Sequence, residues 1–134
     1  MRRLKVTMAL AVVAASATLP VVLTASPAAA APQCVLALYY DNNYVPGSDD
    51  LSPSCTMGYG AYGNAVRELQ TNLNTCYRKG LTVDGDFGGK TRDALKSVQS
   101  SLGITSDGVY GPQTARAMNH RIVAGGGRCD RITF

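Results

Sequence analysis

The chain has 134 residues and a formal net charge of +4 at pH 7. Three of its thirteen basic residues lie in the first five positions, in a segment that we expect to be removed, which leaves ten basic residues against nine acidic ones. This near balance gives no electrostatic case for nucleic acid or a membrane surface as a partner, because phosphates demand clustered Lys and Arg. The remaining part, 31–134, is long enough for one domain with one modest core.

The N-terminal segment has the pattern of a secretory signal peptide. A basic start precedes a mostly apolar run over 8–23, and small residues at 28–30 offer a cleavage site. A membrane anchor is the alternative, but Pro20 interrupts the apolar run and no stop-transfer charges follow it. We predict a signal peptide over 1–30, cleavage before Ala31, and a secreted, extracellular product with no membrane attachment after cleavage.

All four cysteines, Cys34, Cys55, Cys76 and Cys129, lie in the exported part. An even count in a small secreted chain indicates two disulfides. Zinc is the alternative, but no CxxC pair is present and the chain has one histidine, so we predict no metal. Of the three pairings, we favour Cys34–Cys55 with Cys76–Cys129. The span between the first two is too polar to hold itself, and Cys129 closes a tail with few apolar anchors.

The segment after the signal peptide lacks a strong helical pattern. Gln33–Tyr40 is apolar and aromatic, which is consistent with a short strand, although the alternation is imperfect. Asp41–Ser54 is rich in Asn, Asp, Ser, Pro and Gly, which is typical of a loop. We therefore expect 31–58 to form an irregular extension closed by a disulfide.

Apolar residues recur at helical spacing in three later segments. They predict helices over 65–79, 90–102 and 112–123, the first with Asn64 as its N-cap. Three glycines at 125–127 should then end regular structure. The predicted fold is all-α, a three-helix bundle over residues 59–134 with a C-terminal tail, preceded by the extension.

The two links between these helices repeat one motif at an offset of 23 residues, in 80–95 and 103–118. Each copy has an Asp-Gly turn, then an aromatic residue (Phe87 or Tyr110), and a glycine where the next helix starts. The Asp accepts backbone N–H bonds and the Gly permits positive φ. The expected structural turn residues are Asp84, Gly85, Gly88, Asp107, Gly108 and Gly111.

Three motifs stand in order along the chain: a helix start, G-x-A-V-x-x-L-Q at 63–70, and two turns, D-G-x-[aromatic]-G-x-x-T at 84–91 and 107–114, with Gln99 between the turns. Together they resemble the peptidoglycan-binding-domain-1 family over about Gly60 to His120. The resemblance implies a three-helix module that docks on the bacterial cell wall, commonly as an accessory of the hydrolases that cut it.

Two features depart from the family pattern. Val98 precedes Gln99, where the family usually has an aromatic residue. The cysteines and the segment from Ala31 to Gly58 lie outside the shared pattern, so the resemblance does not reach the purpose of that extension.

No catalytic set is evident in the sequence. His120 has no partner at a zinc or nucleophile spacing, and we expect it on the surface at a helix end. Asp84, Asp86 and Asp107 could form an acid–base set or a calcium loop, but the matched turn role explains the first and last of them better. We predict no enzymatic activity, no metal and no cofactor.

Peptidoglycan offers sugar hydroxyls, amides and carboxylates, which call for planar aromatics, amides and a few cations. The ligand-binding candidates, on or beside the second turn, are Arg92, Tyr110, Gln113, Arg116 and Asn119. For Tyr110 the alternative is a structural ring with only its hydroxyl exposed.

We predict a secreted, monomeric, non-catalytic module that binds peptidoglycan and associates with the cell wall. Two alternatives remain open. One is a secreted protease inhibitor that uses the Asp41–Ser54 loop, and the other is a targeting subunit of a separate cell-wall hydrolase.

Overall fold

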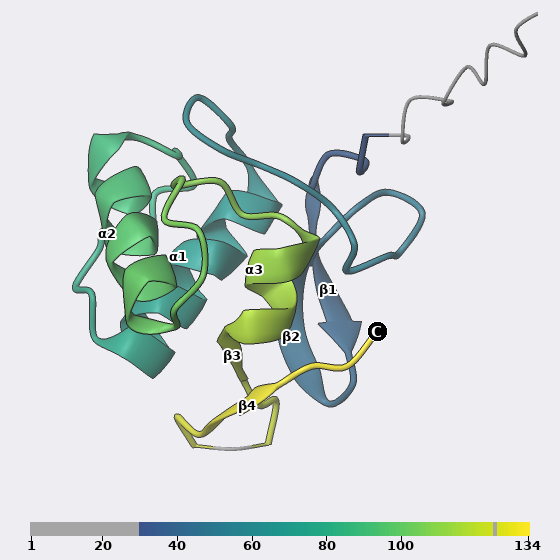
Figure 1. Cartoon of the computed structure of the whole chain (residues 1–134). Helices are drawn as coiled ribbons and strands as arrows, with labels where there is room; N and C mark the ends of the chain where they lie inside the picture. The colour runs from purple at the N-terminus through teal and green to yellow at the C-terminus, as the bar shows by residue number, and fades with distance from the viewer. Residues whose placement is uncertain (1–29, 125) are drawn as a thin grey trace, which may run out of the picture.

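Three consecutive helices lie between two β-hairpins along the chain in the computed structural model, which describes residues 30–124 and 126–134. The helices are α1 (Asn64–Tyr77), α2 (Gly89–Ser101) and α3 (Pro112–Ala117). The all-α prediction is therefore wrong, because two antiparallel sheets complete the structure (Figure 1). In this described part of the chain, no helix is long and apolar enough to cross a membrane. The predicted signal peptide lies outside it, apart from residue 30.

The first hairpin lies in the extension. Strand β1 (Leu36–Tyr40), in the segment expected to be a short strand, pairs antiparallel with β2 (Asn43–Gly47), which lies in the segment predicted to be a loop. Asp41 and Asn42 form the two-residue turn with φ of 48° and 62°. Positive φ at both positions is the twist that a tight hairpin favours, and Asp and Asn tolerate it. The polar residues at 41–42 thus mark the turn of a hairpin and not the start of a long loop.

Helix α1 is the central element, and it contacts α2, both strands of the first hairpin and β3 (Figure 1). Its buried apolar side chains, Ala65, Val66, Leu69 and Leu73, follow helical spacing. The helix begins and ends within two residues of the predicted range. Gly63 occupies the N-cap that we expected at Asn64, and Arg78 ends the helix in the left-handed conformation.

The third helix is much shorter than predicted. It ends at Ala117, and Met118 is extended. Strand β3 (Asn119–Arg121) follows and pairs with β4 (Cys129–Arg131). The glycines at 126–127 therefore lie in a hairpin and do not end regular structure.

Side chains of α1 explain why the chain leaves the helical path there. The Tyr77 hydroxyl accepts the Asn119 N–H at 2.6 Å, and Asn72 Oδ1 accepts the Arg121 N–H at 2.9 Å. These acceptors satisfy backbone donors that a longer helix would have bonded within itself.

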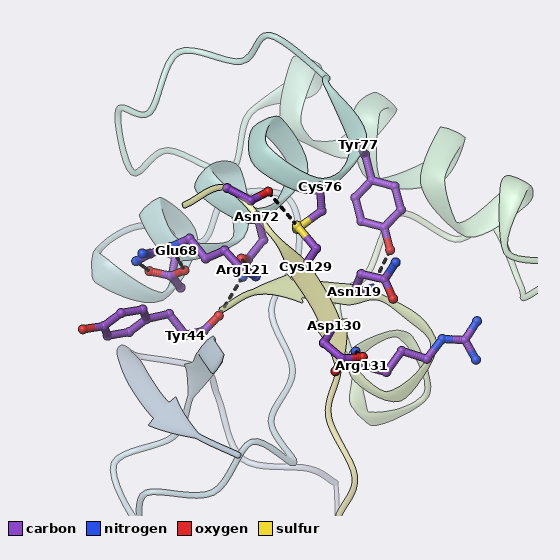
Figure 2. The surroundings of a disulfide bond; sticks show 11 residues. Tyr44, Glu68, Asn72, Cys76, Tyr77, Asn119, Arg121, Cys129, Asp130 and Arg131 are labelled. Carbon is purple, nitrogen blue, oxygen red and sulfur yellow. Dashed lines mark hydrogen bonds and ion pairs between the residues drawn. A yellow bond between two sulfur atoms is a disulfide. The ribbon is translucent and has the colours of Figure 1, made fainter. Parts of the chain in front are cut away.

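One disulfide closes the extension around the first hairpin, and the other fastens the second hairpin to the rest of the protein. The bonds are Cys34–Cys55 and Cys76–Cys129, the pairing that we favoured from the sequence. The second bond joins α1 to β4 (Figure 2). Chain-entropy arguments give roughly 3 kcal/mol for the shorter loop and roughly 4 kcal/mol for the longer one.

Candidate functional site

The first repeated turn is organised by the buried amide of Gln70 on α1. Its Nε2 donates toward Asp84 Oδ1 (2.8 Å), the Asp86 carbonyl (3.0 Å) and Thr91 Oγ1 (3.1 Å). Its Oε1 accepts the Gly85 N–H at 2.9 Å. One amide therefore links α1, the turn and the start of α2.

The second turn has the same arrangement around Gln99 of α2. Its Nε2 lies 2.8 Å from Asp107 Oδ1, 2.9 Å from the Val109 carbonyl and 3.1 Å from Thr114 Oγ1. Its Oε1 accepts the Gly108 N–H at 2.8 Å. We call these two sets of residues the turn clusters.

The two central amides do not follow the repeat. Gln70 precedes Asp84 by 14 residues, whereas Gln99 precedes Asp107 by 8. The sequence places both residues in the family pattern, but their shared role is not visible in it, because Gln70 lies well before the end of α1 whereas Gln99 lies in the last turn of α2.

The turn aspartates are committed to hydrogen bonds within their clusters. Asp84 Oδ1 also accepts the Asp86 N–H at 2.9 Å, and Asp107 Oδ1 accepts the Val109 N–H at 2.9 Å. The Gln70 amide, helped by the Asp86 N–H, lowers the pKa of Asp84. Across residues 30–124 and 126–134, no three His, Cys, Asp or Glu residues are grouped as metal ligands would be.

One segment, residues 57–63, bridges the two turn clusters. Met57 and Tyr110 exchange two backbone hydrogen bonds of 2.9 Å. A few residues later, the Gly60 N–H donates to the Phe87 carbonyl (3.0 Å) and the Phe87 N–H to the Ala61 carbonyl (2.9 Å). The matched aromatic residues of the repeat are thus held by the same stretch of chain, and both rings are buried in the core.

The burial of Tyr110 corrects two expectations from the sequence. Its hydroxyl meets His120 Nε2 at 3.2 Å inside the protein, so neither its ring nor its hydroxyl faces a ligand at the surface. His120 is a buried residue of β3 and does not lie on the surface at a helix end.

The same burial keeps both groups of this pair neutral. It raises the pKa of Tyr110, with a smaller effect from the charge of Glu68. It lowers the pKa of His120 from 6.5 to about 4. The pair is a structural contact between the second turn and β3.

The other candidates divide between two places. Gln113 and Arg116 are exposed on α3, where the Arg116 guanidinium lies 4.5 Å from the Phe134 ring centroid and Nε donates to the Phe134 carbonyl at 3.1 Å. Asn119 follows on β3 and is partly buried. Arg92 is exposed on α2, with its guanidinium 5.4 Å from the centroid of the Tyr59 ring.

The match of residues 62–118 to the family described as putative peptidoglycan binding domain covers α1, both turn clusters and α3. Residues 62–118 belong to this family. The peptidoglycan-binding domain thus includes every residue of the two turn clusters. The extension, the Cys34–Cys55 bond and the second hairpin fall outside it. Of the Cys76–Cys129 bond, only Cys76 lies inside.

Three relatives illustrate where such domains occur. The zinc D-Ala-D-Ala carboxypeptidase of Streptomyces albus G is 40% identical over 63 residues, which is 46% of this chain and 25% of that protein. The N-acetylmuramoyl-L-alanine amidase CwlM of Mycobacterium tuberculosis is 42% identical over 63 residues, 46% of this chain and 15% of that protein. The crystal structure of the SleB N-terminal domain shares 36% identity over 46% of this chain and 84% of that chain, with a TM-score of 0.44.

Proposed function

We propose that this protein is a secreted, non-catalytic module that binds bacterial cell-wall peptidoglycan. The observation that carries the proposal is the family match over residues 62–118, which includes both turn clusters. The Streptomyces relative is named as a D-Ala-D-Ala carboxypeptidase and the Mycobacterium relative as an N-acetylmuramoyl-L-alanine amidase, but this chain spans a quarter or less of either one. The shared part therefore corresponds to a binding accessory.

The chemistry of the described residues supports a role without catalysis. His120 is buried and neutral, and in each turn aspartate one carboxylate oxygen accepts hydrogen bonds within the turn cluster. A general acid or base must reach a proton on the substrate, which a group enclosed in the core does not do. Two disulfides suit export to an oxidising compartment.

The exposed members of the predicted ligand-binding set are Arg92, Gln113 and Arg116, and Asn119 is partly exposed. We keep these four as candidate peptidoglycan contacts and remove Tyr110. The inhibitor alternative keeps only residues 48–54 of its candidate loop, because Asn43–Gly47 is strand β2. The alternative of a targeting subunit for a separate hydrolase is compatible with the same binding activity.

Sedimentation with purified insoluble peptidoglycan tests the proposal, with chitin and cellulose as controls. We expect the secreted protein to pellet with peptidoglycan and to release no soluble fragments from it. A protein that stays wholly in the supernatant would contradict binding, and released muropeptides would contradict the non-catalytic role. A Gln113→Ala/Arg116→Ala variant should pellet less than wild type if these residues contact the wall.

A further inference from the structure

Two exposed tyrosines lie on the segment that bridges the turn clusters. Tyr59 is 69% exposed and Tyr62 is 81% exposed, whereas Phe87 and Tyr110, the aromatic residues next to them in space, are buried. Aromatic rings make large apolar contacts when they are covered, so a pair left open on one surface marks a candidate binding surface.

The backbone under these rings is held firmly. Besides the bonds to Phe87, the Gly63 N–H donates to the Gly85 carbonyl at 2.9 Å. Gly60 and Gly63 adopt φ of 90° and 112°, which other residues rarely reach. The tyrosines therefore project from a backbone that needs little ordering when a ligand binds, which favours affinity.

Two open grooves, of about 270 and 550 Å³, share Gly60, Ala61 and Tyr62 as lining residues. The smaller groove also contains Tyr59 and the carboxylate residue Asp86. The larger one continues to Gln33 and Val35 of the extension and to Asn64. The two grooves together thus offer tyrosine rings, side-chain amides and a carboxylate residue.

The extension reaches this surface because it is tied down beside it. The Cys34–Cys55 disulfide and the hydrogen bond from the Cys34 N–H to the Thr56 carbonyl (2.9 Å) hold Gln33–Val35 there. These residues lie outside the family match at 62–118. The larger groove is consequently a feature that this chain adds to its peptidoglycan-binding domain.

We propose that Tyr59, Tyr62 and the neighbouring Gln33 and Asn64 form a subsite for sugar rings of the peptidoglycan glycan strand, an inference that rests on the proposed function. A pyranose ring has an apolar C–H face that stacks on a tyrosine and a rim of hydroxyl groups that bonds to amides and carboxylates. A stem peptide, with its carboxylates, would instead call for cations. Among the described residues that line the two grooves there is no Lys or Arg, and the nearby Arg92 lies over the Tyr59 ring.

Calorimetric titration with peptide-free glycan strands, released from peptidoglycan by an amidase, tests the subsite. We expect Tyr59→Ala and Tyr62→Ala each to weaken binding by about tenfold. Tyr59→Phe and Tyr62→Phe keep the ring face and should stay within about threefold of wild type. Tyr39→Ala is the matched control, because Tyr39 is 59% exposed on β1, away from both grooves, and should bind like wild type.

The outcomes separate the two proposals. Wild-type binding to whole peptidoglycan with unchanged glycan affinity in both alanine variants would overturn the subsite and leave the proposed function standing. Alanine variants that lose affinity for free stem peptides, and not for glycan strands, would also overturn it. A wild-type protein that fails to sediment with peptidoglycan would overturn both. Thermal unfolding of each variant confirms that the substitutions leave the fold intact.

Discussion

Glu68 of α1 and Arg121 of β3, 53 residues apart, form a two-pronged salt bridge with Nε–Oε1 and Nη2–Oε2 distances of 2.8 Å (Figure 2). The Glu68 side chain is only 5% exposed, and the guanidinium also lies 4.2 Å from the Tyr44 ring centroid. The hydrogen bonds that Arg121 donates to the Glu68 carboxylate raise the pKa of Arg121. One side chain thereby joins the C-terminal hairpin to α1 and to β2.

Breaking this salt bridge should destabilise the protein strongly. Arg121→Ala leaves a buried carboxylate without a partner, and we expect a loss on the order of 3 kcal/mol in the free energy of unfolding. Asp93→Ala is the control, because it breaks the exposed Arg92–Asp93 pair at 3.4 Å and should cost less than about 1 kcal/mol. Urea denaturation at pH 7 measures both, and equal losses would contradict the structural role of Arg121.

The turn clusters predict equal sensitivity at two positions that the repeat does not align. Gln70→Glu and Gln99→Glu keep the side-chain shape but replace the Nε2 donor by an acceptor that faces Asp84 or Asp107. Each should cost about 2–3 kcal/mol of stability, because the buried position loses its donor and gains a carboxylate beside the turn aspartate. Gln113→Glu, exposed on α3, should change stability by less than about 0.5 kcal/mol. A large effect at one glutamine alone would show that the clusters are not equivalent.

Two glycines separate backbone strain from steric crowding. Gly103 has φ of 68° and open space where a Cβ would be, so Gly103→Ala should cost about 1–2 kcal/mol from the left-handed backbone alone. Gly108 has φ of 73°, and its Cβ would lie 2.7 Å from Arg92 Cγ. Gly108→Ala should therefore destabilise the protein by about 1 kcal/mol more than Gly103→Ala does, as measured by chemical denaturation. Identical losses would mean that Arg92 moves aside freely.

His120 predicts a pH dependence of stability. Its pKa is lowered from 6.5 to about 4 by burial, so between these values the unfolded chain holds a proton that the folded protein lacks. The resulting loss in the free energy of unfolding is absent above pH 6.5, grows as the pH falls toward 4, and then levels off. The total loss is on the order of 3 kcal/mol.

Urea denaturation from pH 7 to pH 4 on wild type and His120→Gln measures this effect. The variant cannot titrate here, so its stability should fall less than that of wild type, and parallel curves would contradict the prediction. Asp84 acts in a lower range. Because its pKa is lowered below 3.8, its contribution is present above that value and is lost as the pH falls through the folded pKa in both proteins.

Features that depend on neighbouring residues were readable from the sequence. Helices α1 and α2 lie within two residues of their predicted ranges, since apolar spacing specifies the buried face of a helix locally. The Asp-Gly turns were also predicted, because Asp and Gly have conformational preferences that hold in any context.

The tertiary structure alone decided the rest. Residues 119–121 continue a helical pattern, but Tyr77 and Asn72 capture their backbone donors and direct them into β3. His120 is buried because Tyr110 and β3 meet in the core, and Glu68 finds Arg121 across 53 residues. A pattern along the chain reports local geometry, whereas burial and partner choice depend on which distant segments pack together. For that reason the sequence by itself determined the repeated turns, the two long helices and the family, while only packing decided which of its aromatic residues face the solvent.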